Sequence, residues 1–292
     1  MLFKDYFNPT PENQQTIGFK PNMYINFLRF LSKILIKILF LNGKNRFSNE
    51  FIQSLNPLDE VIFRNKKFFF RTGHGRLHWR VKTFYSEEPM IIEFLNNINH
   101  KDIFVDIGSN VGIYSVPAAY FAKKVYTFEM DLNNSQLLFE NLYLNSLLEK
   151  AVVFPTALSK NLVIEKVFYR SFSKGDALHN IGSPSPELKG NFEGFKHNSL
   201  MFSYDFLIEK FNLERANKIK IDVDGSELKV IQGIQQNLDF FKEIYIEIND
   251  DIEENKAIYE LLEKSNFYIF KIEKNKNKSH GNISMVYFKK KD

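Results

Sequence analysis

The sequence predicts an α/β domain in which helices flank a mostly parallel sheet of seven strands. From residue 102 onward, short apolar stretches alternate with stretches of helical periodicity, the pattern of successive strand–helix units. The expected strands are 103–107, 124–128, 151–154, 218–223, 243–248, 268–272 and 284–288, and the expected helices include 112–121, 133–146 and 255–264. We expect the last two strands to pair antiparallel at one edge of the sheet. This domain is assigned to residues 87–292.

An N-terminal extension is predicted for residues 1–86, beginning with an amphipathic helix. Its apolar stretch 24–41 is interrupted at four-residue spacing by Arg29, Lys33 and Lys37, which places these residues on one face of a helix. Such a helix lies on a surface instead of spanning a bilayer. It either packs on the domain with snorkelling lysines or makes peripheral contact with a membrane.

Three further segments are assigned by their local patterns. A short helical piece is expected at 49–55, and the alternation of apolar and polar residues over 61–85 predicts a β-hairpin region with a turn at 72–75. Between residues 168 and 202 the periodicity fails, and Ser, Gly, Pro, Asn and Lys dominate. An insert of this length in a compact domain is usually a lid, a substrate-binding segment or disorder, and we expect a substrate lid.

Composition excludes several kinds of site and partner. The 292 residues include no cysteine, which excludes a disulfide scaffold, a thiolate zinc site and a cysteine nucleophile. The formal net charge is only +4, so we expect no nucleic-acid partner. The first residues lack the plan of a signal peptide, and we expect a cytoplasmic protein; contact with the inner face of the membrane through residues 24–41 is the alternative to packing of that helix on the domain. No feature of the sequence specifies an oligomeric state.

The strand 103–107 carries an acid, Asp106, and continues through two glycines into a predicted helix. Gly108 permits a tight turn and the close approach of a ligand, and the helix that opens near Gly112 offers unpaired N–H groups. A ligand with a carboxylate or another negative charge suits this position. The alternative is a tight strand-to-helix connection without a ligand.

The next strand is followed by a second acid, Glu129, about twenty residues past Gly108. Rossmann-type domains place an acid there to hold the two ribose hydroxyls. Asp106 stands two residues before Gly108, an arrangement that differs from Gly-x-Gly-x-x-Gly and would face an amino-acid moiety instead of a pyrophosphate. The pattern therefore favours S-adenosylmethionine over a nicotinamide dinucleotide.

Three segments carry these motifs in order, namely 105–112, 128–129 and 219–227, and two more, 88–89 and 203–207, extend the pattern. Together they resemble the FkbM family of methyltransferases. The resemblance implies a Rossmann-like methyltransferase fold and the O-methylation of a hydroxyl, often of a sugar or polyketide-type compound, by S-adenosylmethionine. Two positions depart from the family: Met130 replaces a proline after Glu129, and Asp224 replaces a glutamate.

The resemblance also implies which residues bind the cofactor, in three groups along its length. The methionine half would meet Asp106, Gly108, Asn110 and Gly112. The ribose would meet Glu129. The adenine side would meet Met130, Thr156 and Ala157.

Methyl transfer from a sulfonium is an in-line displacement, in which the protein aligns the acceptor oxygen and, where needed, removes its proton. Asp222, at the C-terminal end of a predicted strand, is the first candidate for this role, and its alternative is a structural carboxylate. His179 and His197 lie in the insert and are candidate bases because histidine titrates near neutral pH; the alternative is two ordinary loop histidines.

A divalent cation is a further option at the same place, since Asp222, Asp224 and Glu227 offer carboxylate oxygens. No metal site is assigned, because Glu227 is expected to begin a helix while the two aspartates share a face of the strand. The leading hypothesis is thus a methyltransferase that acts on a sugar hydroxyl in a cell-surface glycan or related natural product, with a small-molecule or glycan acceptor. The alternatives are a nicotinamide-dependent oxidoreductase and a non-catalytic membrane-surface or interaction module on a relic Rossmann domain.

Overall fold

The computed structural model describes residues 23–40, 57–73, 75–185, 192–274 and 282–291. The chain divides into two compact units, Met1–Pro57 and Leu58–Asp292. The predicted helical piece at 49–55 lies outside the described residues.

Helix α3 (Met23–Phe40) is the described element of the first unit and confirms the helix predicted from the spacing of its residues. Its sequence contains no acidic residue. Six large apolar side chains on it are between 39% and 60% exposed: Phe27, Phe30, Leu31, Ile34, Leu35 and Ile38. Within the described part of the chain, no helix has both the length and the apolar character to span a membrane.

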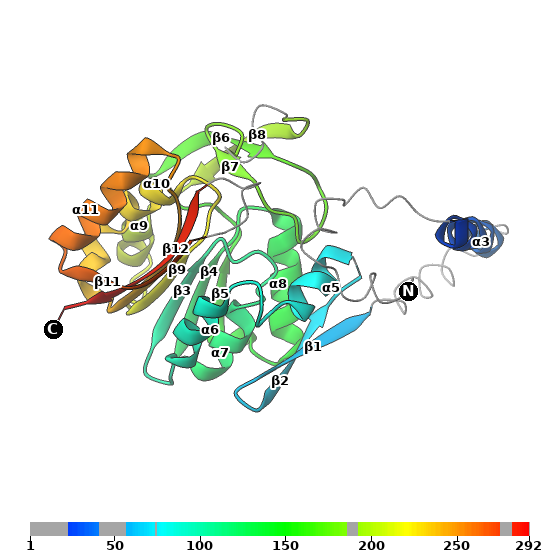
Figure 1. Cartoon of the computed structure of the whole chain (residues 1–292), viewed down its shortest axis with the longest axis horizontal. Helices are drawn as coiled ribbons and strands as arrows, with labels where there is room; N and C mark the ends of the chain where they lie inside the picture. Colours follow the sequence, from blue (N-terminus) through cyan, green and yellow to red (C-terminus); the bar gives the residue numbers. More distant parts are fainter. Residues whose placement is uncertain (1–22, 41–56, 74, 186–191, 275–281, 292) are drawn as a thin grey trace. The chain divides into compact units, whose positions relative to one another are not determined.

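The second unit is built on a seven-stranded sheet. Its strands are β3 (Ile103–Ile107), β4 (Lys124–Phe128), β5 (Ala151–Phe154), β9 (Lys218–Ile221), β10 (Glu243–Asn249), β11 (Phe267–Lys274) and β12 (Ile283–Lys290). They lie in the order β11-β12-β10-β9-β3-β4-β5 (Figure 1). The run from β10 to β5 is parallel, whereas β12 pairs antiparallel with both β10 and β11. The predicted α/β fold, with its antiparallel edge pair, is confirmed.

Helices cover both faces of this sheet (Figure 1). One layer contains α6 (Pro89–Asn96), α7 (Ser115–Phe121) and α8 (Leu132–Leu144), and the other contains α9 (Tyr204–Lys210), α10 (Glu227–Gly233) and α11 (Lys256–Lys264). Short 3-10 helices lie at Leu148–Lys150, Gln235–Phe240 and Glu253–Asn255. Successive side chains of a strand point to opposite faces, so Phe104 packs with the first layer and Val105 with the second. Strand β3 is therefore buried along its whole length, and Asp106 is its one polar residue.

A β-hairpin opens the second unit. Strands β1 (Leu58–Phe63) and β2 (Lys66–Arg71) pair antiparallel, and a two-residue turn at Arg64 and Asn65 connects them. The φ angles of these two residues, 49° and 61°, are typical of a type I′ turn. Alternate side chains of the two strands are buried in the core of the first helix layer: Val61, Phe63, Phe68 and Phe70. The hairpin thus packs within the unit that starts at Leu58.

The hairpin turn predicted at 72–75 is wrong. The hairpin turns at Arg64-Asn65, and helix α5 (Gly75–Lys82) begins at the end of the segment where the turn was expected. Leu77 and Val81 of α5 are both buried and lie four residues apart. Residues at this spacing share one face of a helix. The apolar positions after residue 75 therefore follow helical spacing and not strand alternation.

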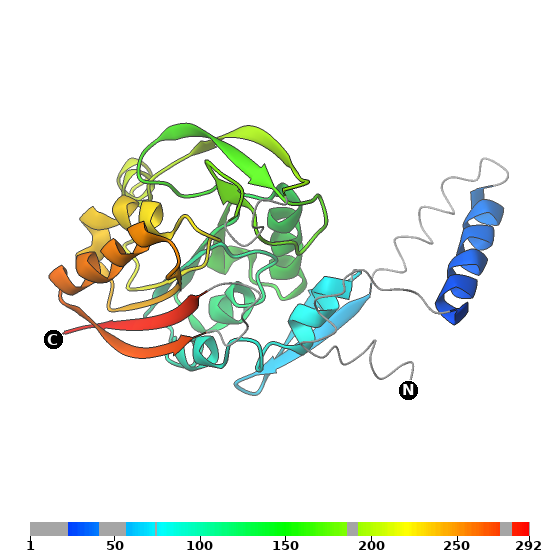
Figure 2. The ribbon, with the colours of Figure 1, turned by 45° about the horizontal axis from the view of Figure 1, so that its top comes forward.

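The predicted insert 168–202 is more ordered than its sequence suggested. Strands β6 (Val163–Tyr169), β7 (Asn180–Ile181) and β8 (Phe195–Met201) form a separate antiparallel sheet in the order β7-β6-β8, which Figure 2 shows as its own layer. The failed periodicity is explained by β8, in which polar residues occupy most exposed positions. Residues 186–191 of the insert lie outside the described residues.

Candidate active site

Acidic side chains collect where the parallel strands end. The register pairs Asp106 of β3 with Lys220 of β9, and Ile221 of β9 with Ile246 of β10. Asp222 therefore follows β9 beside Glu247 of β10. Because parallel strands present their carboxyl ends at one edge of the sheet, this edge is the place where an open α/β sheet binds ligands.

The two motif glycines serve the packing of the chain. Gly108 has φ +75°, and a Cβ added to it would lie 1.7 Å from the carbonyl oxygen of Asp222. Gly112 has φ +80°, and its added Cβ would lie 2.2 Å from Cδ1 of Leu138 on α8. The sequence predicted that Gly108 leaves room for a ligand. The structure fills that room with the backbone after β9, so these glycines hold the loop against β9 and α8.

The helix after this loop begins later than predicted. Helix α7 starts at Ser115, and the N–H of Gly112 donates to the carbonyl of Ser109 at 2.9 Å. The first helical turn nevertheless opens at Gly112, since the N–H of Val116 donates to its carbonyl at 2.9 Å. Asn110, at φ 48°, directs its backbone N–H to Glu129 and its side-chain Nδ2 to the carbonyl of Asp176, at 2.8 Å each.

Glu129 lies directly after β4, as predicted, and is 7% exposed. Its two carboxylate oxygens accept hydrogen bonds of 2.8 Å from the backbone N–H groups of Asn110 and Asp131. Burial raises the pKa of Glu129 to about 7, against the effect of these hydrogen bonds. Each oxygen keeps a further lone pair, so a carboxylate fixed in this way can also accept bonds from the hydroxyls of a ribose.

Asp106 is fully inside the protein, at 1% exposure. The hydroxyl of Ser115 donates to its Oδ2 at 2.5 Å, and Nζ of Lys220 lies 3.5 Å from its Oδ1. Burial raises the pKa of Asp106, and the charge of Lys220 works in the opposite direction. The structure thus places Asp106 beneath the candidate site as a partner of Lys220.

Lys220 is a central residue of the site that the sequence reasoning missed. It is 1% exposed, and its Nζ lies 2.9 Å from Oδ2 of Asp222 in addition to its contact with Asp106. Burial lowers the pKa of Lys220, but the neighbouring carboxylates outweigh it and raise the pKa above its ordinary value. The sequence did contain a signal for this residue, namely a lysine within a predicted buried strand, two residues before an acid. A buried charge requires a partner, so such a lysine is expected to pair with nearby carboxylates.

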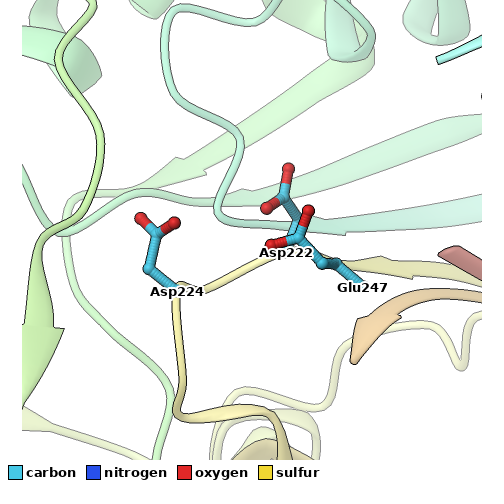
Figure 3. Close-up of side chains that lie close together, drawn as sticks. All are labelled: Asp222, Asp224 and Glu247. Carbon is cyan, nitrogen blue, oxygen red and sulfur yellow. The ribbon is translucent and has the colours of Figure 1, made fainter. Parts of the chain in front are cut away.

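Three carboxylates gather next to this pair. One carboxylate oxygen from each of Asp222, Asp224 and Glu247 lies within 4.8 Å of the other two, and Figure 3 shows Asp222 and Glu247 close together with Asp224 on the loop beyond β9. Burial, followed by the charges of Asp222 and Asp224, raises the pKa of Glu247 well above its ordinary value. Carboxylate oxygens are ligands that a divalent cation prefers, so this set could hold a cation or a shared proton.

Glu227 was considered with Asp222 and Asp224 as a cation ligand, but the sequence analysis expected it to begin a helix, as it does in α10. Its side chain is 1% exposed and accepts from the N–H of Gly225 at 2.7 Å and from Nδ2 of Asn255 at 3.4 Å. Burial raises its pKa to about 7. Glu227 is therefore hydrogen-bonded at the start of α10, and the neighbouring strand supplies Glu247 as the third carboxylate of the set.

The predicted adenine-side residues meet the small sheet. Met130 and Ala157 pack against one hydrophobic cluster, which includes Val167 and Tyr169 of β6. The hydroxyl of Thr156 donates to the carbonyl of Leu200 on β8 at 2.9 Å. The structure thus brings the segments after β4 and β5 together beneath β6 and β8.

The two histidines lie on this same side. The rings of His179 and His197 are centred 4.9 Å and 5.1 Å from the ring of Tyr169. His179 is buried, accepts at Nδ1 from the N–H of Arg170 at 3.1 Å, and has Nε2 3.6 Å from Asp131. Burial lowers the pKa of His179. His197 is exposed on β8, and within the described residues neither ring makes a contact with Asp222.

Comparison with known proteins fits this arrangement of strand-end acids. The family model described as the methyltransferase FkbM domain matches residues 106–270, more than half of the chain. The chain belongs to the FkbM methyltransferase family. This FkbM protein is also similar to the hexuronic acid methyltransferase AglP of Haloferax volcanii, with 26% identity over 179 residues, which cover 60% of this chain and 67% of AglP.

Two solved structures are also similar to this FkbM protein. One is the methyltransferase FkbM of Methylobacillus flagellatus, with 14% identity and a TM-score of 0.45 over 73% of this chain and 54% of that one. The other is an rRNA methylase of Streptococcus thermophilus, with 14% identity and a TM-score of 0.44 over 70% of this chain and 95% of that one.

Proposed function

We propose that this FkbM protein is an S-adenosylmethionine-dependent O-methyltransferase whose acceptor is a sugar hydroxyl in a cell-surface glycan or related natural product. Its family membership supports methyl transfer. The similarity to AglP, a methyltransferase of hexuronic acid, supports a sugar acceptor. The observation that carries the cofactor assignment is Glu129, which two backbone N–H groups fix at the end of β4.

The residues at the carboxyl edge fit S-adenosylmethionine in chemical character. Glu129 would hold the ribose hydroxyls, and Met130 and Ala157 would face the adenine side from the cluster beneath the small sheet. The carboxylates after β9 and in β10 suit the positive charge of the cofactor's amino group. When bound, the cofactor supplies the methyl group as an electrophile.

Asp222 is assigned the role of orienting the acceptor hydroxyl and accepting its proton. Lys220 holds Oδ2 of Asp222 at 2.9 Å, and no hydrogen bond reaches Oδ1 from the described residues. The side chain is 29% exposed, so an acceptor can reach it. When the acceptor oxygen takes the methyl group and the bond between that group and the cofactor's sulfur breaks, this carboxylate would accept the hydroxyl proton. His179 and His197 are less suited to this role, because both contact Tyr169.

Titration calorimetry with S-adenosylhomocysteine tests the cofactor assignment. We expect Glu129→Gln to weaken binding by about tenfold or more, because the replaced oxygen no longer accepts both the backbone and a ribose hydroxyl. Glu149→Gln, at an exposed position, is the matched control and should bind like the wild type. A folded wild type that fails to bind would favour the non-catalytic module, and binding of NADH in its place would favour an oxidoreductase.

Transfer of a labelled methyl group to uronic acids, neutral glycosides and glycan fractions tests the reaction. Asp222→Asn should lose about 10²–10⁴-fold in transfer rate, a loss larger than its change in affinity for S-adenosylhomocysteine, since it removes the proton acceptor in addition to one negative charge at the site. Full transfer activity in this variant would show that another group accepts the proton.

We also propose that α3 contacts a membrane surface that carries anionic lipid. Arg29, Lys33 and Lys37 recur at four-residue spacing, no acid balances them in this helix, and apolar residues occupy most of the rest. Large apolar side chains such as Phe30 and Ile38 are 59% and 60% exposed. A narrow basic face beside a wide apolar face is typical of a helix that lies in the plane of an anionic membrane.

Co-sedimentation of the full chain with vesicles tests this contact. Vesicles of phosphatidylcholine with phosphatidylglycerol should pellet the protein, and pure phosphatidylcholine or high salt should pellet less. The double variant Lys33→Glu, Lys37→Glu should stay in the supernatant, whereas Lys160→Glu, an exposed change in the second unit, should not alter pelleting. Equal pelleting of the wild type and the double variant would reject α3 as the contact.

A further inference from the structure

Helix α5 places two arginines at the carboxyl edge of the sheet. Its buried Leu77 packs with Val111, in the loop after β3, and with Leu137 of α8, beside which Figure 1 shows this helix. Arg76 and Arg80 follow one turn apart, so they lie on the same side of the helix. The helix is thus anchored to the loop that also carries Gly108 and Asn110.

Both arginines contact the segment between β6 and β7, which lies at the candidate site. Arg76 Nη1 lies 2.6 Å from Oδ1 of Asp176, and Nε of Arg80 donates to the carbonyl of Gly175 at 3.2 Å. The same segment reaches the site at two points. The carbonyl of Asp176 accepts from Nδ2 of Asn110 at 2.8 Å, and the N–H of Leu178 donates to Oδ2 of Asp224 at 2.7 Å.

The two arginines differ in their partners. Arg76 is ion-paired with Asp176, whose carboxylate also accepts from Ser171 and lies 3.8 Å from Nη1 of Arg170. Arg80 is half-buried, and no carboxylate within the described ranges forms an ion pair with it at 4.0 Å or less. A guanidinium has five N–H donors, so Arg80 retains donors for a planar anion.

The charge of Arg80 acts on residues of both the β3–β4 side and the β9–β10 side of the site. Burial raises the pKa of Glu129 and of Tyr114, and the charge of Arg80 is among the influences that lower both. Glu129 is the candidate ribose ligand, and the ring of Tyr114 is centred 5.8 Å from Nζ of Lys220. Lys220 is already paired with Asp106 and Asp222. Arg80 therefore has donors left for an incoming anion, and its charge acts on both Glu129 and Tyr114.

We propose that Arg80 binds a carboxylate in the reaction complex, either that of the cofactor's methionine half or that of an acidic sugar acceptor. This inference rests on the proposed function. An incoming carboxylate would be repelled at this edge by Asp222, Asp224 and Glu247, and Lys220 is already paired with two carboxylates. Arginine suits the task, because its planar fork binds a carboxylate through two parallel hydrogen bonds.

Two pairs of probes separate the sources of the carboxylate. S-adenosylhomocysteine and 5′-methylthioadenosine share the nucleoside and the thioether, but only the former carries a carboxylate. Glucuronate and methyl glucoside, added to protein saturated with S-adenosylhomocysteine, differ in the same group on the acceptor side. Calorimetry measures the first pair and ligand-observed NMR the second, so neither readout depends on turnover.

Arg80→Gln should weaken the binding of one carboxylate-bearing probe by about tenfold or more and leave the binding of its counterpart without a carboxylate unchanged. Loss on S-adenosylhomocysteine alone identifies the cofactor as the source, and loss on glucuronate alone identifies the acceptor. Arg80→Lys keeps the charge without the fork and should give a smaller loss. Arg215→Gln, an exposed arginine over Phe240, is the matched control and should change neither probe.

Equal affinity of wild type and Arg80→Gln for both charged probes would overturn the inference. A loss that is equal for S-adenosylhomocysteine and 5′-methylthioadenosine would overturn it too, because it would indicate a structural role. Thermal melting verifies that the variants are folded. If Arg80→Gln does not fold, Arg80→Lys is used for the same comparison. A folded wild type that binds none of the four probes would remove the proposed function and this inference together, whereas unchanged binding in the variants would remove only the inference.

Discussion

The β3–β4 side and the β9–β10 side of the carboxyl edge differ in how their acidic side chains are paired. On the β3–β4 side, each acid has partners within the chain: Asp106 accepts from the hydroxyl of Ser115 and lies 3.5 Å from Nζ of Lys220, and Glu129 accepts from two backbone N–H groups. On the β9–β10 side, Asp222, Asp224 and Glu247 crowd within 4.8 Å of one another. The first half is organised before any ligand arrives, whereas the second concentrates repulsion that a proton, a cation or a substrate can relieve.

Lys220 joins the two halves, and removing it should give the largest effect. Lys220→Met leaves Asp106 and Asp222 without their buried cation, and we expect a loss of about 3–5 kcal/mol in the free energy of unfolding measured with urea. The matched control is Lys123→Met, which removes an exposed pair with Glu214 and should cost about 0–1 kcal/mol. Equal losses in the two variants would mean that the buried pair does not connect the halves.

Gly108 tests the contact between the halves sterically. Gly108→Ala puts a Cβ at 1.7 Å from the Asp222 carbonyl, and we expect a loss of about 2–4 kcal/mol in the free energy of unfolding. Gly182→Ala has a similar φ of +84° but no neighbour closer than 3.7 Å, so it should lose only about 1–2 kcal/mol from backbone strain. A Gly108 variant as stable as the Gly182 variant would contradict the close approach.

The pH dependence of stability should separate the crowded half from ordinary acids. Burial, followed by the charge of Asp222, raises the pKa of Glu88 from 4.5 to about 7, and the charge of Lys220 works in the opposite direction. The folded state then binds this proton more tightly than the unfolded state, so the stabilisation is complete below pH 4.5 and is lost as the pH rises through about 7.

Glu88→Gln removes this loss. Its melting temperature relative to that of the wild type should therefore increase between pH 4.5 and pH 7 and then level off. Glu149→Gln, at an exposed position, should give a difference that does not change over this range. A pH-independent difference for Glu88→Gln would show that Glu88 titrates normally in the folded protein.

The smallest effect is expected at His197, outside both halves. This exposed ring stacks on Tyr169, so His197→Ala should change the free energy of unfolding by about 0.5 kcal/mol or less. The methyl-transfer rate should not change. His179→Ala, at the buried neighbour, should cost about 1–3 kcal/mol, because it leaves the N–H of Arg170 without its acceptor. A large loss of methyl transfer in His197→Ala would return this residue to the catalytic candidates.

The sequence by itself determined the seven strands of the main sheet and the acids Asp106, Glu129 and Asp222 at the strand ends. Strand and helix periodicity are local properties, and they place 103–107, 124–128 and 151–154 as the structure has them. The hairpin turn at Arg64-Asn65 was missed, because these two residues do not form the Asn-Gly or Asp-Gly pair that usually signals a type I′ turn. Strand β8 was missed for a related reason, since its exposed polar residues lack a hydrophobic pattern.

Only the tertiary structure decided which charges meet. Lys220 faces Asp106 because β3 and β9 are neighbours in the sheet, although more than a hundred residues separate them in the chain. Glu247 and not Glu227 joins Asp222 and Asp224, because the register of β9 and β10 sets the strand ends side by side. Arg80 reaches the site from a helix that precedes the sheet. Strand order and helix packing follow from burial over the whole domain, and no local pattern encodes them.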